Sequence, residues 1–184
     1  MIITISGRPG SGKSVVASRV ADALGVRHKS AGDFMREMAA ERGISILELS
    51  RLAEQDDAID AEIDGRTRRL AHTGEDFVID ARLGWHFVPE SFKVFLDVRP
   101  EVAARRIYEA QRGTESENID LETTRAAVES RTKSETSRYR EYYGLAYTDP
   151  SHYDVVVDTS DLTVDEVVER VLSESATGRS SAEF

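Results

Sequence analysis

The sequence predicts an α/β fold, in which helices cover both faces of a five-stranded parallel sheet. Two observations predict this fold. The apolar residues 2–5 lead directly into a glycine-rich loop that a helical pattern follows. Short apolar stretches then alternate with helical patterns through the rest of the chain. Ligands of such sheets bind at the carboxyl ends of the strands, so we expect the functional residues there.

The glycine-rich loop has the pattern of a phosphate-binding P-loop, with the sequence Gly7-Arg8-Pro9-Gly10-Ser11-Gly12-Lys13-Ser14. Its glycines let the backbone wrap around a polyphosphate, and the helix that follows adds the positive end of its dipole. Lys13 can reach the β- and γ-phosphates, and Ser14 can ligate Mg²⁺. A glycine-rich turn without a ligand is the alternative, which the strand-to-helix context disfavours. We therefore expect these eight residues to bind ATP.

The first half of the chain continues with a helix over residues 13–24, which Gly25 ends. A short strand follows at 26–30, and a helical segment at 31–42 ends at Gly43. The sequence Ser45-Ile46-Leu47-Glu48 is a capping box that begins another helix. A further helix is expected from about residue 57 to 72, so that residues 31–74 form a helical, acceptor-binding insertion before the third strand.

The second half supplies the remaining strands at 77–79, 92–98 and 153–158. Pro100 begins a helix that runs to about residue 111, Asp120 caps a long helix to about 142, and Thr163 caps the last one. The polar stretch within 105–119 is expected to be a short, mobile lid. We expect one P-loop kinase domain over residues 1–175 and a disordered tail at 176–184.

Composition excludes several classes of protein. The chain has 184 residues, no cysteine and a formal net charge of −10. No apolar run approaches the roughly 20 residues that a membrane helix needs. So acidic a surface repels nucleic acid phosphates. We expect a cytoplasmic protein, monomeric by default, that has no nucleic-acid or membrane partner and binds small nucleotides.

Polar residues that could serve a phosphoryl transfer recur near the expected strand ends and on the long helix. They are Ser30, Asp33 and Arg36 after the second strand, Asp80 and Arg82 after the third, Arg106 and Arg112 around the lid, and Arg131, Glu135 and Arg138 on the long helix. Spacings of three and four residues put the last three on one face of that helix. Turn caps, surface ion pairs and a solvated helix face are the alternatives. Several arginines beside a P-loop nevertheless favour a second phosphorylated ligand.

The same segments carry a resemblance to a known family. The P-loop, Ser30-Ala31-Gly32-Asp33 with Arg36, Asp80-Ala81-Arg82-Leu83 and Arg131 to Gly144 resemble the short, archaeal-type cytidylate kinases, which are nucleoside monophosphate kinases. This chain has Ala81 where the family usually has glycine. The resemblance implies Mg²⁺- and ATP-dependent phosphorylation of CMP or dCMP.

The resemblance also implies roles for individual residues. Arg36, Arg82, Arg131 and Arg138 would bind phosphate, Asp80 would lie near the acceptor and the metal, and Glu135 would help to hold the pyrimidine nucleotide. The expected catalytic set consists of Lys13, Arg82, Arg131 and Arg138 with the lid residues Arg106 and Arg112, whereas Arg36 is expected to bind the acceptor. A kinase for another acceptor (AMP, UMP, a nucleoside or a sugar acid) is the first alternative. A nucleotide-dependent switch or ATPase is the second.

Overall fold

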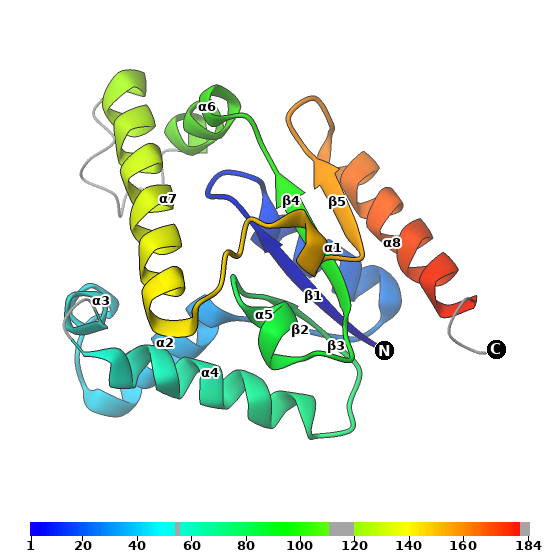
Figure 1. Cartoon of the computed structure of the whole chain (residues 1–184), viewed down its shortest axis with the longest axis horizontal. Helices are drawn as coiled ribbons and strands as arrows, with labels where there is room; N and C mark the ends of the chain where they lie inside the picture. Colours follow the sequence, from blue (N-terminus) through cyan, green and yellow to red (C-terminus); the bar gives the residue numbers. More distant parts are fainter. Residues whose placement is uncertain (54–55, 111–119, 181–184) are drawn as a thin grey trace.

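The computed structural model describes residues 1–53, 56–110 and 120–180, and a twisted parallel sheet lies at its centre (Figure 1). Its five strands are β1 (Ile2–Gly7), β2 (Arg27–Ser30), β3 (Phe77–Asp80), β4 (Phe92–Asp97) and β5 (Val155–Asp158). They lie side by side in the order β2-β3-β1-β4-β5, and each neighbouring pair is parallel. The predicted fold class is confirmed, and all the carboxyl ends lie at one edge of the sheet.

The helices match the predicted ones closely. They are α1 (Lys13–Leu24), α2 (Ala31–Arg42), α3 (Ile46–Ala53), α4 (Asp57–Ala71), α5 (Gly84–Phe87), α6 (Pro100–Ala110), α7 (Leu121–Tyr143) and α8 (Val164–Ser180), with a 3-10 turn η1 (Pro150–His152). The side chain of Asp120 accepts a 2.7 Å hydrogen bond from the backbone N–H of Thr123, and so caps α7 as expected. Thr163 and Glu166 form a reciprocal capping box at the start of α8.

Three features differ from the expectation. The short α5 and η1 were not predicted, because a single turn leaves no periodic pattern in the sequence. The disordered tail expected from residue 176 is wrong for 176–180, which continue α8. Ser175 explains the longer helix in part, because it is only 3% exposed and its hydroxyl donates to the carbonyl of Leu172. Residues 181–184, like most of the expected lid, lie outside the described part.

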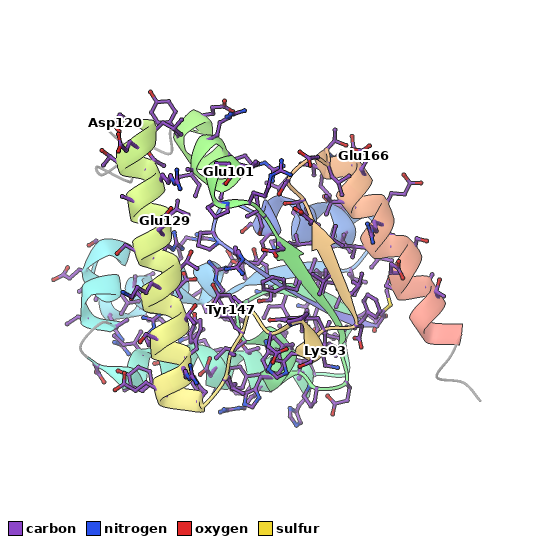
Figure 2. The ribbon with its side chains drawn as sticks, turned by 45° about the horizontal axis from the view of Figure 1, so that its top comes forward. Lys93, Glu101, Asp120, Glu129, Tyr147 and Glu166 are labelled. Carbon is purple, nitrogen blue, oxygen red and sulfur yellow. The ribbon has the colours of Figure 1, made fainter. Side chains whose placement is uncertain are left out.

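The two faces of the sheet are covered by different helices. Ile3 and Ile5 point to one face, where α1 and α8 pack on them, whereas Phe77 and Ile79 point to the other face, under α2 to α4. Alternate strand residues point to opposite faces, so both faces of a covered sheet are apolar. On the second face, Tyr147 is fully buried between α7 and the sheet (Figure 2).

Trp85 and Phe87 of the segment Trp85-His86-Phe87 belong to the core on this second face, whereas His86 is exposed. Trp85 and Phe87 are 8% and 6% exposed and pack with Phe95 and Tyr147. The ring of Trp85 also stacks on that of His152 at 4.2 Å. Trp85 and Phe87 therefore contribute to packing.

Residues 31–74 contribute Phe34, Met38, Leu49, Ile59 and Ile63 to the apolar core on the second face of the sheet. Figure 1 shows α2, α3 and α4 grouped beside the C-terminal end of α7. The hydroxyl of Tyr143 on α7 donates to the carboxylate of Asp64 on α4. Burial raises the pKa of Asp64 to about 6, although this hydrogen bond opposes the shift. The contact that joins α4 to α7 therefore partly desolvates the Asp64 carboxylate, which disfavours its charged form.

The raised pKa of Asp64 predicts that the stability of the fold depends on pH. The folded protein holds the Asp64 proton more tightly than the unfolded chain, whose carboxyl has a pKa of about 3.8. The free energy of unfolding should therefore fall as the pH rises from about 4 to above 6. Asp64→Asn keeps an acceptor oxygen for Tyr143 and cannot ionise. Thermal melts should show this variant gaining stability over the wild type across that range, whereas the exposed Asp22→Asn should not. A pH-independent difference would contradict the assignment.

Candidate active site

The P-loop backbone is fixed by two glycines in the left-handed region. Gly10 has φ of +77° and Gly12 has φ of +82°. A Cβ atom on Gly10 would lie 2.8 Å from Ala103, so the loop lies directly against α6. Gly12 is the N-cap of α1 and supplies no side-chain hydrogen bond, which leaves the first N–H groups of the helix available to an anion. The loop lines a hollow of about 210 Å³.

Residues around the loop hold it in place. The Nε of Arg8 donates a 2.6 Å hydrogen bond to Asp97, at the end of β4. The hydroxyl of Thr159 donates to the carbonyl of Ser11 at 3.2 Å. Arg106 on α6 lines the P-loop hollow and donates to the carbonyl of Thr159 at 2.6 Å. The structure thus brings Arg106 to the wall of the P-loop hollow, while Arg112 lies outside the described residues.

Lys13 lies at the floor of the hollow, with its side chain 15% exposed. Its Nζ is 3.8 Å from Asp80 Oδ2, so this pairing is longer than a hydrogen bond. Burial, followed by the nearby charge of Arg82, lowers the pKa of Lys13 to about 8. The protein alone therefore does not fully neutralise this ammonium group, and a polyphosphate would do so.

Asp80 ends β3 and is 2% exposed, and its Oδ2 has no hydrogen-bond partner among the described residues. Its other oxygen is 3.9 Å from His28 Nε2. A buried carboxylate oxygen without a donor is suited to a cation. The exposed hydroxyl of Ser14 lines the same cleft, so the pair fits the expected Mg²⁺. Within the described ranges no group of three or more metal-binding side chains occurs.

A two-armed ion pair connects β3 to the long helix. Arg82 donates to Glu135 through Nε at 2.8 Å and through Nη2 at 3.2 Å. The Nε of Arg131 reaches the same carboxylate at 3.1 Å. Burial by itself would raise the pKa of Glu135, but Arg82 and Arg131 hold it below its usual value. Glu135 is thus ionised and orients both guanidinium groups.

A second, larger hollow of about 1080 Å³ opens beside the P-loop, between α2, α4, α7 and the end of β3. Its lining includes all the residues predicted to bind an acceptor, namely Ser30, Asp33, Arg36, Asp80, Arg82, Arg131, Glu135 and Arg138. Lys13, Ser14, Arg82 and Arg131 line this hollow and the P-loop hollow alike. The two hollows therefore meet at three cations and one hydroxyl.

The predicted residues that line this cleft have different partners and lie on different elements. Asp33 pairs with Arg36 in the first turns of α2, where Ser30 caps the helix through a 2.9 Å hydrogen bond from the N–H of Asp33. Arg138 lies instead beside Asp60 of α4, with 3.6 Å between Nε and Oδ2.

Sequence reasoning missed Asp60 and His28, both of which line the cleft. Asp60 is one of several acidic residues of α4, and no local pattern distinguishes it from the others. His28 left no signal either, because its strand is short and mostly polar.

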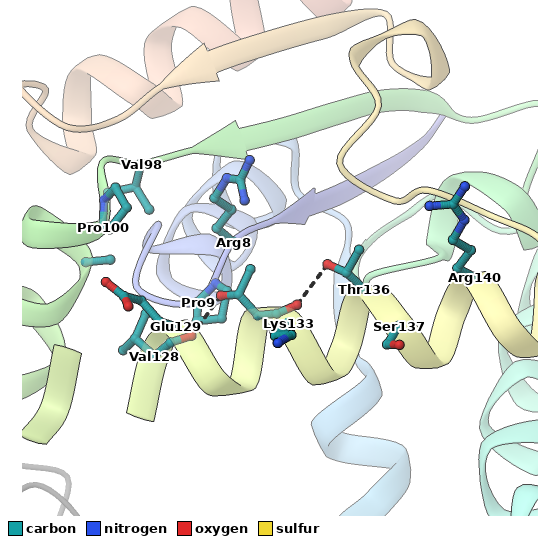
Figure 3. Close-up of a pocket in the computed structure, with 12 residues that line it drawn as sticks. Arg8, Pro9, Val98, Pro100, Val128, Glu129, Lys133, Thr136, Ser137 and Arg140 are labelled. Carbon is teal, nitrogen blue, oxygen red and sulfur yellow. Dashed lines mark hydrogen bonds between the residues drawn. The ribbon is translucent and has the colours of Figure 1, made fainter. Parts of the chain in front are cut away.

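Helix α7 presents different charges on its two sides. Arg131, Glu135 and Arg138 line the acceptor cleft, as their spacing predicts. Lys133 and Arg140 line a separate groove of about 450 Å³ behind the P-loop, together with Pro9, Val98 and Val128 (Figure 3). The predicted stripe is therefore confirmed as one face of the helix, and that face is turned toward the site.

Known proteins resemble this chain over most of its length. The model of the cytidylate kinase-like family matches residues 2–161. A cytidylate kinase of Natronomonas pharaonis is 41% identical over 178 residues, which cover 96% of this chain and 88% of that protein. A cytidylate kinase of Methanothermobacter thermautotrophicus is 42% identical over 160 residues, which cover 87% and 96%.

Among solved structures, the shikimate kinase of Bacteroides thetaiotaomicron superposes with a TM-score of 0.62 at 17% identity, covering 94% of this chain and 97% of that one. This likeness shows the fold alone. The family match shows more, because it includes the P-loop, the strand ends and the arginine-bearing face of α7. The chain belongs to the cytidylate kinase-like family.

Proposed function

We propose that this protein transfers the γ-phosphoryl group of ATP to CMP or dCMP. The observation that carries the proposal is the junction of the two hollows at Lys13, Ser14, Arg82 and Arg131. One hollow has the backbone of a triphosphate site, and the other has the cations and the volume for a second nucleotide. Membership of the family, and the named cytidylate kinases at about 41% identity, support cytidine nucleotides as acceptors.

The donor would be held mainly by main-chain groups. The P-loop N–H groups surround the β-phosphate, and Lys13 contacts the β- and γ-phosphates. Ser14 and Asp80 would hold Mg²⁺, which offsets charge on the phosphates when it is bound. Arg106 on the wall of the same hollow contacts the donor, and Arg112 remains a proposed lid residue.

The acceptor phosphate would lie opposite, against Arg82 and Arg131, with Arg36 at the rim of the cleft. Glu135 keeps the first two guanidinium groups oriented, so little side-chain entropy is lost on binding. The acceptor is already an anion and needs no general base. The protein therefore acts by holding two mutually repelling anions in line and by offsetting their charge.

The other proposals follow from the sequence. The partners of this chain would be small nucleotides, and the monomer is the default. In the described part of the chain, no helix has the length and apolarity to cross a bilayer.

The acceptor is tested directly by measuring ADP release with ATP, Mg²⁺ and a panel of CMP, dCMP, UMP, AMP and shikimate. We expect CMP and dCMP to be used best. Lys13→Met should lower kcat with CMP by about 100-fold or more, because it removes a buried cation aimed at the transferred group. Rapid ATP hydrolysis without any acceptor, or inertness toward both cytidine nucleotides, would reject the proposal.

Nucleotide binding should be coupled to a proton. The pKa of Lys13 is about 8 in the free protein, and triphosphate favours the charged form. Binding of ATP at pH 8 should therefore take up protons, and affinity should weaken as the pH rises from 7 to 9. Calorimetry in buffers of different ionisation enthalpy measures this uptake. Lys29 lies outside both hollows, so Lys29→Met should retain the proton uptake, whereas Lys13→Met should lose it.

Arg36 should act on the acceptor alone. A charge-assisted contact is worth roughly 1.5–3 kcal/mol, so Arg36→Ala should raise the KM for CMP by about tenfold or more and leave the KM for ATP unchanged. Arg42→Ala is the matched control, because it removes an arginine from the same helix that pairs with Glu62 outside the cleft. Equal CMP kinetics in the two variants would remove Arg36 from the site.

A further inference from the structure

We propose that Asp60, together with Arg138, reads the edge of the acceptor base and makes the enzyme select cytosine over uracil. This inference rests on the proposed function, because it concerns the base of the same acceptor. It gives Arg138 a different role from the phosphate contact that the sequence predicts.

The position of the pair within the cleft is the first step. Arg131 and Arg138 are seven residues apart on α7, which is about 10 Å along the helix axis at 1.5 Å per residue. Arg131 lines both hollows, whereas Arg138 lines only the acceptor cleft. A nucleotide whose phosphate is held by Arg131 and Arg82 would thus extend its base toward Arg138 and, across the cleft, toward Asp60 of α4.

The surroundings of the pair suit a base. Met35, Ala53 and Ile63 line the same cleft, together with the ring of Tyr139. Ile63 is three residues after Asp60, so both lie on one face of α4. Ala53 and Ile63 are each 9% exposed. These apolar groups can cover the faces of a planar ring, while Asp60 and Arg138 address its edge.

The hydrogen-bonding capacity of the pair points to cytosine. A carboxylate only accepts hydrogen bonds, and a guanidinium group only donates them. Cytosine presents an amino donor next to two acceptors, the ring nitrogen and the carbonyl, so it complements an Asp beside an Arg. Uracil has a carbonyl oxygen where cytosine has the amino group, and a ring N–H where cytosine has the ring nitrogen. The carboxylate would then face an acceptor, and the guanidinium group would face a donor. Sites built on such contacts reject the mismatched analogue strongly.

The guanidinium group of Arg138 has hydrogen-bonding capacity that Asp60 does not use. The 3.6 Å between Arg138 Nε and Asp60 Oδ2 exceeds a normal hydrogen bond. Arg138 Nε is buried and has no hydrogen-bond partner in the part of the chain that the structure describes. A bound base would therefore supply the hydrogen bond that this nitrogen lacks.

The other carboxylate–guanidinium pairs in the cleft are less suitable. Glu135 is already held by Arg82 in two hydrogen bonds. Asp33 and Arg36 are in direct contact on α2, next to the strand end that carries Asp80. Both pairs thus lie at the phosphate end of the cleft, whereas Asp60 and Arg138 lie away from the P-loop.

The test compares kcat/KM for CMP and UMP in the full-length protein. Asp60→Asn replaces an acceptor-only group with an amide that can also donate to the carbonyl of uracil, so the ratio of CMP to UMP should fall at least tenfold. The KM for ATP should stay at the wild-type value. Asp64→Asn is the matched control, one turn further along α4 and absent from the cleft lining, and should keep the wild-type ratio.

A second variant keeps the test decisive if Asp60→Asn does not fold. Arg138→Lys retains the charge but loses the planar fork, and should lower the same ratio. Either variant losing CMP and UMP activity equally, or keeping the wild-type ratio, would overturn the inference. A wild type that uses UMP as well as CMP would also overturn it, while leaving the phosphotransferase function in place. A wild type inert with both pyrimidine nucleotides would reject the proposed function itself.

Discussion

The two-armed contact between Arg82 and Glu135 is the interaction on which the site depends. Both side chains are nearly buried, at 12% and 11% exposure, and they join residues 53 positions apart. A buried charge is tolerated only with a well-placed partner, and removing either partner leaves the other uncompensated. Because Glu135 also holds Arg131, one carboxylate keeps two guanidinium groups beside Lys13. The protein thus gathers three cations where it has too few anions to balance them, and phosphorylated ligands fill that deficit.

The parallel sheet explains why these charges converge. Lys13 comes after β1, Asp80 ends β3 and Arg82 comes two residues later. The two strands are hydrogen-bonded neighbours, with Ile5 opposite Asp80. Backbone spacing therefore fixes the distance between the P-loop and the carboxylate of Asp80, which is proposed to bind Mg²⁺, independent of any surface contact. Helix α7 is added from the far side, where Glu135 joins it to Arg82 beyond β3 and Val128 packs with Val98 and Ala103.

Local signals predicted the elements and the donor site well, for physical reasons. The P-loop is a continuous stretch, and the Arg131, Glu135 and Arg138 stripe follows from the period of a single helix, so both can be found without knowing the fold. Asp60 was missed because its place in the cleft depends on the packing of α4 against α7, which the spacing of residues within α4 does not show. Arg106 was predicted as a lid residue from its place in the chain, whereas its contact with Thr159 depends on how α6 packs against the end of β5. The one-turn α5 was missed because four residues are too few to show a helical period, and residues 176–180 were missed because most of them are small or polar.

The division of the site into two hollows also separates two kinds of recognition. Main-chain N–H groups of the P-loop bind phosphate, which every nucleotide carries, so that wall cannot distinguish one base from another. Discrimination requires side chains at the far end of the acceptor cleft, and there α4 and α7 supply Asp60 and Arg138. Those helices are themselves joined by the contact between Tyr143 and Asp64, about one turn beyond the proposed base site. The half-buried Asp64 carboxyl weakens the fold at neutral pH, and its hydrogen bond with Tyr143 joins the two helices, a link for which Asp64→Asn retains an acceptor oxygen.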